Sequence, residues 1–246
     1  MELSVAVAAQ GALLAALRPG VFGWAAGAVY AVAFWSVLSA AFRRRPLGPA
    51  DHVTLVRVVL AGAVTALVAD SAARHVAHGP ATGGGSVAAL VAIAAVALVL
   101  DGVDGRVARR TGTCSPLGAR FDMEVDAFLI LVLSVQVAAS AGAWVLAIGA
   151  MRYAFAAAAW TAPWLRAPLP PSLARKTVAV VQGVVLVVAA AGVVPHADIA
   201  VAAALTVLTW SFGRDIVWLS LRRRDELRVR RTGAARRPRV LDPVTR

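Results

Sequence analysis

Apolar residues follow one another in long runs along this chain, and the polar residues gather between the runs. A run of about 20 apolar residues, coiled as a helix, matches the hydrocarbon thickness of a bilayer. The strict alternation of apolar and polar residues that is typical of a membrane β-barrel is absent. The pattern therefore predicts an all-α integral membrane protein: a six-helix transmembrane core bundle with one or two extra N-terminal hydrophobic helices. The apolar runs cover residues 3–17, 21–41, 53–70, 86–105, 117–139, 141–161, 177–194 and 197–219.

The runs divide the chain into three parts. Residues 1–46 are expected to form N-terminal hydrophobic anchor helices, and 47–221 the transmembrane domain. The first run is short for a span and lacks the features of a signal peptide, so it is interpreted as a retained anchor or interfacial helix. Residues 222–246 are rich in arginine and are expected to form a disordered cytoplasmic tail. Such a tail can bind the anionic headgroups of membrane lipids.

Composition and charge agree with a membrane protein. Of the 246 residues, 60% are hydrophobic and 15% charged, whereas soluble domains carry about 25% charged residues. The single cysteine, Cys114, excludes an internal disulfide and a cysteine-based metal site. The net charge of +12 raises the question of nucleic acid, but the basic residues fall on one side of the membrane if the runs alternate. The positive-inside rule makes that side cytoplasmic, so we expect a cytoplasmic-membrane protein with no nucleic-acid partner.

Four aspartates lie where one apolar run ends and the next begins. Asp101 and Asp104 are three residues apart, and Asp122 and Asp126 are four apart. On helices each pair lies on one face, one turn apart. A short basic loop joins the two helices, so both pairs can meet at the mouth of the bundle, which this orientation places at the cytoplasmic surface. Acidic residues at a membrane boundary are functional candidates.

The residues between these acids favour a metal and phosphate site. Ser115 fits an N-cap and Pro116 a first helical position, so a new helix begins there. Carboxylates this close repel one another unless cations separate them, and oxygen ligands favour Mg²⁺, Mn²⁺ or Ca²⁺ over zinc. Gly105 and Gly118 allow a bulky group to approach the backbone, and Arg109 supplies a fork suited to phosphate. Two ions about 3.5–4 Å apart are the usual arrangement for phosphoryl chemistry.

The spacing resembles the signature of the CDP-alcohol phosphotransferases, D-x-x-D-G-x-x-A-R-x8-G-x3-D-x3-D. The signature is long and rigidly spaced, and the resemblance covers about residues 50–220. Every fixed position is matched, by Asp101, Asp104, Gly105, Ala108, Arg109, Gly118, Asp122 and Asp126.

This resemblance implies a reaction in phospholipid synthesis. A CDP-linked lipid, usually CDP-diacylglycerol, donates its phosphatidyl group to an alcohol acceptor, and CMP leaves. The resemblance implies that Asp101 and Asp122 bridge two ions, Mg²⁺ or Mn²⁺, while Asp104 binds one of them and Asp126 the other. It also implies that Asp126 is the general base that takes the proton of the acceptor hydroxyl.

The donor site implied by the resemblance begins at the first core helix. The family pattern N-x-x-T-x-x-R reads DHVTLVR here, with an aspartate in place of the asparagine. Together with signature positions, the residues expected to bind the CDP-alcohol are Asp51, Thr54, Arg57, Gly105, Ala108, Arg109, Ser115 and Gly118.

Basic residues in the later runs are candidates for the acceptor site. Arg152, Lys176 and Arg214 could hold a phosphate on the acceptor alcohol, although basic side chains can also extend from helix ends toward the membrane surface. A small neutral or zwitterionic acceptor therefore stays open. Proteins similar to this one often form homodimers, which the sequence neither supports nor opposes.

Two other classes of membrane protein share some of these features. A UbiA-like prenyltransferase also uses paired aspartate motifs with Mg²⁺, but its pairs lie far apart in sequence, whereas these span residues 101–126. A cation-binding membrane transporter would place its acids near the bilayer midplane, whereas these lie at a boundary beside arginines.

Overall fold

The computed structural model describes residues 2–42, 49–78, 84–111, 116–170 and 172–235, and in these ranges it contains helices and no strands. A helix satisfies its own backbone hydrogen bonds, which lipid cannot do, so apolar runs of this length fold as helices. The elements are α1 (Glu2–Leu17), α2 (Val21–Phe42), α3 (Pro49–His78), α4 (Gly84–Thr111), α5 (Pro116–Ala141), η1 (Ala143–Val145), α6 (Leu146–Thr161), η2 (Pro163–Arg166), α7 (Leu173–Ala191) and α8 (Ala197–Ala235).

Among the described residues, seven helices, α2 to α8, are long and apolar enough to cross a membrane. The apolar stretch of α1, Ser4–Leu17, is shorter. This protein is therefore an integral membrane protein with an all-helical fold, which confirms the fold class predicted from the apolar runs.

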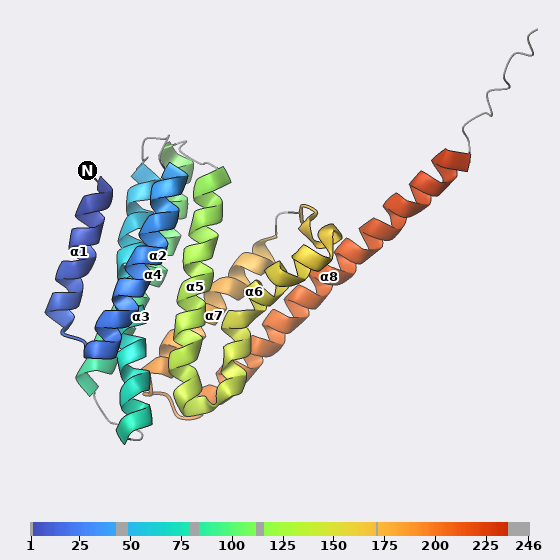
Figure 1. The fold of residues 1–246 in the computed structure, drawn as a ribbon. Helices are drawn as coiled ribbons and strands as arrows, with labels where there is room; N and C mark the ends of the chain where they lie inside the picture. Colours follow the sequence, from blue (N-terminus) through green and yellow to red (C-terminus); the bar gives the residue numbers. More distant parts are fainter. Residues whose placement is uncertain (1, 43–48, 79–83, 112–115, 171, 236–246) are drawn as a thin grey trace, which may run out of the picture.

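Helix α3 lies at the centre of the first five helices and packs against α1, α2, α4 and α5 (Figure 1). Helix α5 also contacts α6 and α7, and α7 contacts α4 and α8. The last three helices lean away from the first five, and α8 projects beyond its neighbours (Figure 1). The helices that carry the four aspartates, α4 and α5, thus both pack against α3.

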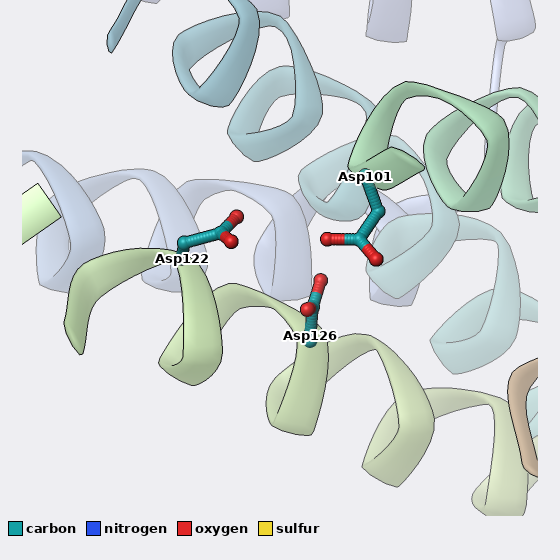
Figure 2. Close-up of side chains that lie close together, drawn as sticks. All are labelled: Asp101, Asp122 and Asp126. Atoms are coloured by element: carbon teal, nitrogen blue, oxygen red, sulfur yellow. The ribbon is translucent and has the colours of Figure 1, made fainter. Parts of the chain in front are cut away.

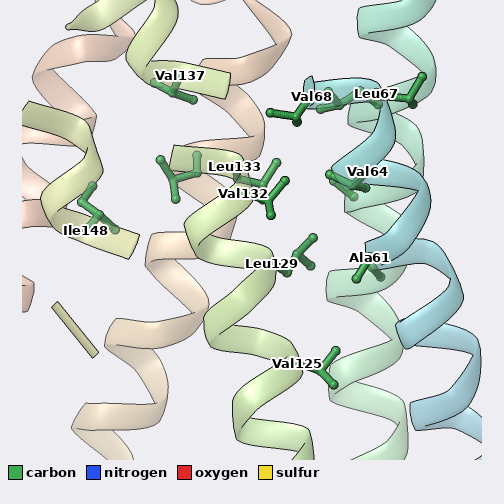
Figure 3. Close-up of a cluster of buried hydrophobic side chains, with 14 of the residues drawn as sticks. Ala61, Val64, Leu67, Val68, Val125, Leu129, Val132, Leu133, Val137 and Ile148 are labelled. Atoms are coloured by element: carbon green, nitrogen blue, oxygen red, sulfur yellow. The ribbon is translucent and has the colours of Figure 1, made fainter. Parts of the chain in front are cut away.

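The main core takes buried apolar side chains from α2 to α8, and a large part of it lies between α3 and α5 (Figure 3). Burying these side chains fixes the rotation of both helices about their axes, and with it the direction in which their polar residues point. The labelled members of this core are Ala61, Val64, Leu67, Val68, Val125, Leu129, Val132, Leu133, Val137 and Ile148.

Helices α5 and α6 approach each other closely at Gly149. A Cβ atom at that position would lie 2.4 Å from the Leu131 Cα and 2.4 Å from the Ser134 Oγ. Small residues allow membrane helices to approach in this way, and van der Waals packing then stabilises the pair. Gly149 is thus where α6 is held against the helix that carries Asp122 and Asp126.

Buried polar side chains join the N-terminal helices to each other. Gln10 is 2% exposed; its Nε2 donates to the Gly27 carbonyl at 3.5 Å, and its Oε1 accepts from Trp35 Nε1 at 3.1 Å. The Tyr30 hydroxyl donates to the Val58 carbonyl of α3 at 2.8 Å. Interhelical hydrogen bonds of this kind stabilise helix association in lipid.

The helix ends agree with the sequence signals in part. Helix α5 begins at Pro116, as predicted, and α7 ends at Ala191, followed by the C-cap Gly192 with φ of 66°. Helix α8, however, continues to Ala235, although a disordered tail was expected from residue 222. Favourable pairs one turn apart explain the difference: Arg222 Nε lies 3.4 Å from Glu226 Oε1, and its guanidinium lies over Trp218. Residues 236–246 of that expected tail lie outside the described residues.

Candidate metal and donor site

Three of the four signature aspartates meet where α4 and α5 face each other. Asp101 of α4 and Asp122 and Asp126 of α5 each offer a carboxylate oxygen, and these oxygens lie within 4.8 Å of one another. Figure 2 shows the three side chains pointing toward a common centre from the two helices. Their side chains are 31%, 30% and 34% exposed, respectively. The site is therefore half-buried and open to solvent.

Arg57 of α3 lies against all three carboxylates. Its side chain is 1% exposed, and its Nη1 lies 3.1 Å from the Asp101 Oδ1. The same Nη1 donates to the Asp122 Oδ1, and Nη2 forms an ion pair with the Asp126 Oδ1. A single guanidinium thus joins α3 to α4 and α5 at the acidic cluster.

Helix packing explains why Arg57 reaches the aspartates. Val58 and Val64 are fully buried in the core that α3 shares with α5, so the polar face of α3 is held toward the cluster. Thr54, one turn before Arg57, is also buried. An arginine within a membrane helix is costly unless it faces the protein interior, and this one does.

Aromatic side chains connect the N-terminal helices to the site. Phe34 of α2 meets Phe121 edge to face, with ring centroids 5.7 Å apart, and Phe128 at 6.0 Å. Phe121 directly precedes Asp122. Such pairs contribute about 0.5–1.5 kcal/mol beyond area burial. Helix α2 thereby fixes the first turns of α5, where two of the three clustered aspartates lie.

The other residues of the predicted site are placed less completely. Gly118 lies in the first turn of α5 and is half-buried. Asp51 lies in the first turn of α3, but its side chain is outside the described part of the structure, and Ser115 is outside it altogether. The backbone of α4 carries the remaining positions in its last turns, with side chains also outside that part: Asp104, Gly105, Ala108 and Arg109.

The candidate acceptor residues lie on three helices and have different surroundings. Arg152 of α6 forms an ion pair with Glu124 of α5. Arg214 of α8 lies over the ring of Trp210, 5.3 Å from its centroid, and 3.5 Å from Asp215. Lys176 of α7 is exposed. The observed contacts therefore do not gather these three residues around one point.

Two charged residues outside the predicted site, Arg175 and Glu124, take part in contacts of this kind. Arg175 Nη1 lies 3.3 Å from both carboxylate oxygens of Asp215, so it joins α7 to α8. Glu124 binds Arg152 on the face of α5 that points away from Asp122 and Asp126. The signal for Glu124 was its position inside an apolar run, where a carboxylate needs a partner.

The donor set of the cluster fits a divalent cation. Its three ligand residues offer carboxylate oxygens, which are the hard ligands that Mg²⁺ and Mn²⁺ prefer. The partial exposure leaves room for water or substrate oxygens, which Mg²⁺ usually retains among its ligands. The described residues thus provide a cluster able to hold a metal ion.

Comparison with known proteins gives the family. The model of the CDP-alcohol phosphatidyltransferase family matches residues 48–212. This range contains the complete aspartate signature and α3 to α7, whereas α1 and α2 lie outside it. No curated protein and no solved structure matches the chain significantly. Because the family match covers well over half of the sequence, the chain belongs to the CDP-alcohol phosphatidyltransferase family.

Proposed function

We propose that this protein transfers a phosphatidyl, or similar substituted phosphate, group from a CDP-linked lipid to a hydroxyl acceptor, with release of CMP. Family membership supports phosphatidyl transfer from a CDP-alcohol. The observation that carries the proposal is the meeting of Asp101, Asp122 and Asp126 beside a buried arginine. A phosphoryl-transfer site needs such anionic ligands together with cationic groups for phosphate.

The proposed cofactor is a pair of Mg²⁺ or Mn²⁺ ions. Asp101, Asp104, Asp122 and Asp126 would hold them, as the signature implies. When bound, such ions neutralise charge on a diphosphate and stabilise a phosphate leaving group. The three described members of this set offer carboxylate oxygens that are close enough to bind one ion together.

The remaining chemistry falls to side chains of this protein. Asp126 accepts the proton of the acceptor hydroxyl, because an alcohol is a weak nucleophile until a base removes that proton. The acceptor oxygen then bonds to the phosphorus that carries the lipid. The bond from that phosphorus to the bridging oxygen breaks, and the bridging oxygen leaves with CMP. The residues proposed to bind the donor are those that the signature and the start of the first core helix imply: Asp51, Thr54, Arg57, Gly105, Ala108, Arg109, Ser115 and Gly118.

An acceptor that itself carries phosphate is our first choice. Arg152, Lys176 and Arg214 are the proposed acceptor-binding residues. Arginine side chains suit this role because a guanidinium can bind a phosphate through two hydrogen bonds. The Arg152 side chain is 39% exposed, so its guanidinium is accessible to a ligand.

The direct test is a CMP-release assay of the purified protein in lipid nanodiscs. CDP-diacylglycerol and Mn²⁺ are supplied with a panel of neutral and phosphorylated alcohols. We expect release that depends on both an acceptor and a metal ion. A folded sample that releases no CMP with any acceptor would overturn the proposal.

The proposed base gives the first site prediction. Asp126→Asn should lower turnover at least about a thousandfold, because the acceptor keeps its proton and a metal ligand is weakened. Binding of CDP-diacylglycerol, measured by calorimetry, should persist at reduced affinity. Asp198→Asn, an exposed substitution in the first turn of α8, serves as the control and should leave the rate unchanged. Wild-type turnover in Asp126→Asn would remove this residue from the mechanism.

A further inference from the structure

The Arg57 guanidinium contacts one oxygen, Oδ1, of each carboxylate in the candidate metal cluster, formed by Asp101, Asp122 and Asp126. A divalent ion held by the same three carboxylates would lie close to this guanidinium. Two cations held by the same carboxylates repel each other strongly in a half-buried site.

The metal-free cluster needs a positive charge of its own. Three carboxylates with oxygens within 4.8 Å of one another repel, and removing the counter-charge of buried ions is strongly destabilising. The guanidinium fork supplies that charge and, being planar and rigid, bridges more than one carboxylate. Arg57 is well suited to this role because the α3–α5 core fixes its helix and its side chain is 1% exposed.

We propose that Arg57 is a built-in counterion that holds the acidic cluster together without metal and is displaced from the carboxylates when metal binds. This inference rests on the metal site of the proposed function. It assigns Arg57 two successive partners, because the displaced fork remains beside the site and matches the geometry of a phosphate. The donor-binding role implied by the family resemblance and the carboxylate contacts in the structure are then two states of one residue.

An order of binding follows from this exchange. The Arg57 guanidinium can bind the diphosphate of the donor only after a metal ion has replaced it at the carboxylates. We therefore expect metal to bind before the CDP-linked lipid, and the affinity for the lipid to rise when Mn²⁺ is present.

Metal affinity in the absence of donor tests the exchange without relying on activity. Full-length wild type and Arg57→Gln are titrated with Mn²⁺ in nanodiscs, and unbound Mn²⁺ is followed by electron paramagnetic resonance. We expect Arg57→Gln to bind Mn²⁺ about tenfold more tightly, because a competing cation is gone. In EDTA, Arg57→Gln should unfold at a lower temperature than wild type. Added Mn²⁺ should raise the unfolding temperature of Arg57→Gln by more than it raises that of wild type.

The matched control lies on the same helix. Arg74→Gln removes an arginine of α3 that is 45% exposed and pairs with Asp70, away from the cluster. Its Mn²⁺ affinity should equal that of wild type. Equal or weaker Mn²⁺ binding by Arg57→Gln would overturn the exchange, since a residue that only binds donor, or only supports the fold, does not compete with metal.

A second measurement covers the case in which Arg57→Gln fails to fold. Wild type with ¹⁵N-labelled arginine is examined by nuclear magnetic resonance, and the Arg57 side-chain signal is identified by its loss in Arg57→Lys. Diamagnetic Mg²⁺ should shift this signal at the concentration that saturates the site. A signal unmoved by bound Mg²⁺ would refute the exchange alone, whereas a wild type that binds neither ion would refute the proposed metal site itself.

Discussion

At the residue scale, several charged residues of the membrane-spanning helices contact partners on other helices. Arg57 meets aspartates of α4 and α5, Arg152 meets Glu124, and Arg175 meets Asp215. Each contact lowers the cost of keeping a charged group within lipid.

The pair of Arg152 and Glu124 leads to a prediction about the acceptor. Arg152→Gln should raise the KM for a phosphorylated acceptor about tenfold or more, because hydrogen bonds to charged groups contribute about 1.5–3 kcal/mol. The KM for the CDP-linked lipid should change much less. Steady-state CMP release at varied concentrations of each substrate separates the two effects.

The control for this prediction is Arg224→Gln, an exposed arginine on the extension of α8. It should change neither KM. If Arg152→Gln instead raised the KM for the lipid donor and spared that of the acceptor, Arg152 would belong to the donor site.

The sequence predicted the aspartate cluster better than the partners of its arginine. Spacing along a helix places Asp122 and Asp126 on one face, and Pro116 marks where that helix begins. The contact of Arg57 with these residues depends on how two helices pack across about 65 positions of sequence. Local spacing carries no information on such a contact, so it required the three-dimensional structure.

At the element scale, the hairpin of α1 and α2 stands out because it lies outside the family match yet packs on the central helix α3. Gln10 bridges α1 to α2, and Tyr30 bridges α2 to α3. Phe34 then reaches Phe121, next to the acidic cluster. The hairpin therefore stabilises the first turns of α5 through these contacts.

Removing the hydrogen bonds of Gln10 should weaken the packing of α1 against α2. Gln10→Leu should lower the free energy of unfolding by about 1 kcal/mol, because single interhelical hydrogen bonds in membranes contribute about 0.6 kcal/mol and Gln10 makes two. Thermal unfolding in nanodiscs measures the change. Val5→Ala, at a position of α1 that is 61% exposed, is the control and should have a smaller effect.

The limits of α1 to α7 could be predicted from apolar runs to within a turn or two, except where polar residues extend α3 beyond residue 70. The end of α8 could not. An arginine-rich sequence is typical of a solvated tail. Here, however, Arg222 pairs with Glu226, and the Nη1 of Arg222 lies 3.4 Å from the Pro168 carbonyl. A helix that begins in the membrane needs no new nucleation to continue past it.

At the scale of the whole molecule, the site and the basic segments lie toward one end. Helix α2 ends, α3 begins and α5 begins at the same end of the bundle, and α8 projects in the same direction (Figure 1). Arginines concentrate in the sequence next to these ends. By the positive-inside rule we propose that this end faces the cytoplasm, with residues 47–221 as the catalytic domain.

This orientation predicts which residues are reached from each side. In a Cys114→Ser background, Asp225→Cys should react with a membrane-impermeant maleimide only in inside-out vesicles. Val193→Cys, in the turn between α7 and α8, should react only in right-side-out vesicles. The extent of labelling, read by gel shift, checks both; the opposite pattern would place the acidic cluster outside the cytoplasm.

The central position of α3 has a consequence for how the protein is made. Asp70 finds the Gly20 amide in the hairpin that is synthesised before it, at 3.0 Å. Arg57, in the third turn of α3, has its carboxylate partners on α4 and α5, and a charged side chain in a membrane segment makes insertion less favourable until it is paired. Integration of α3 should therefore be completed only once α5 has left the ribosome, so nascent chains truncated before α5 should integrate less fully in a glycosylation-mapping assay.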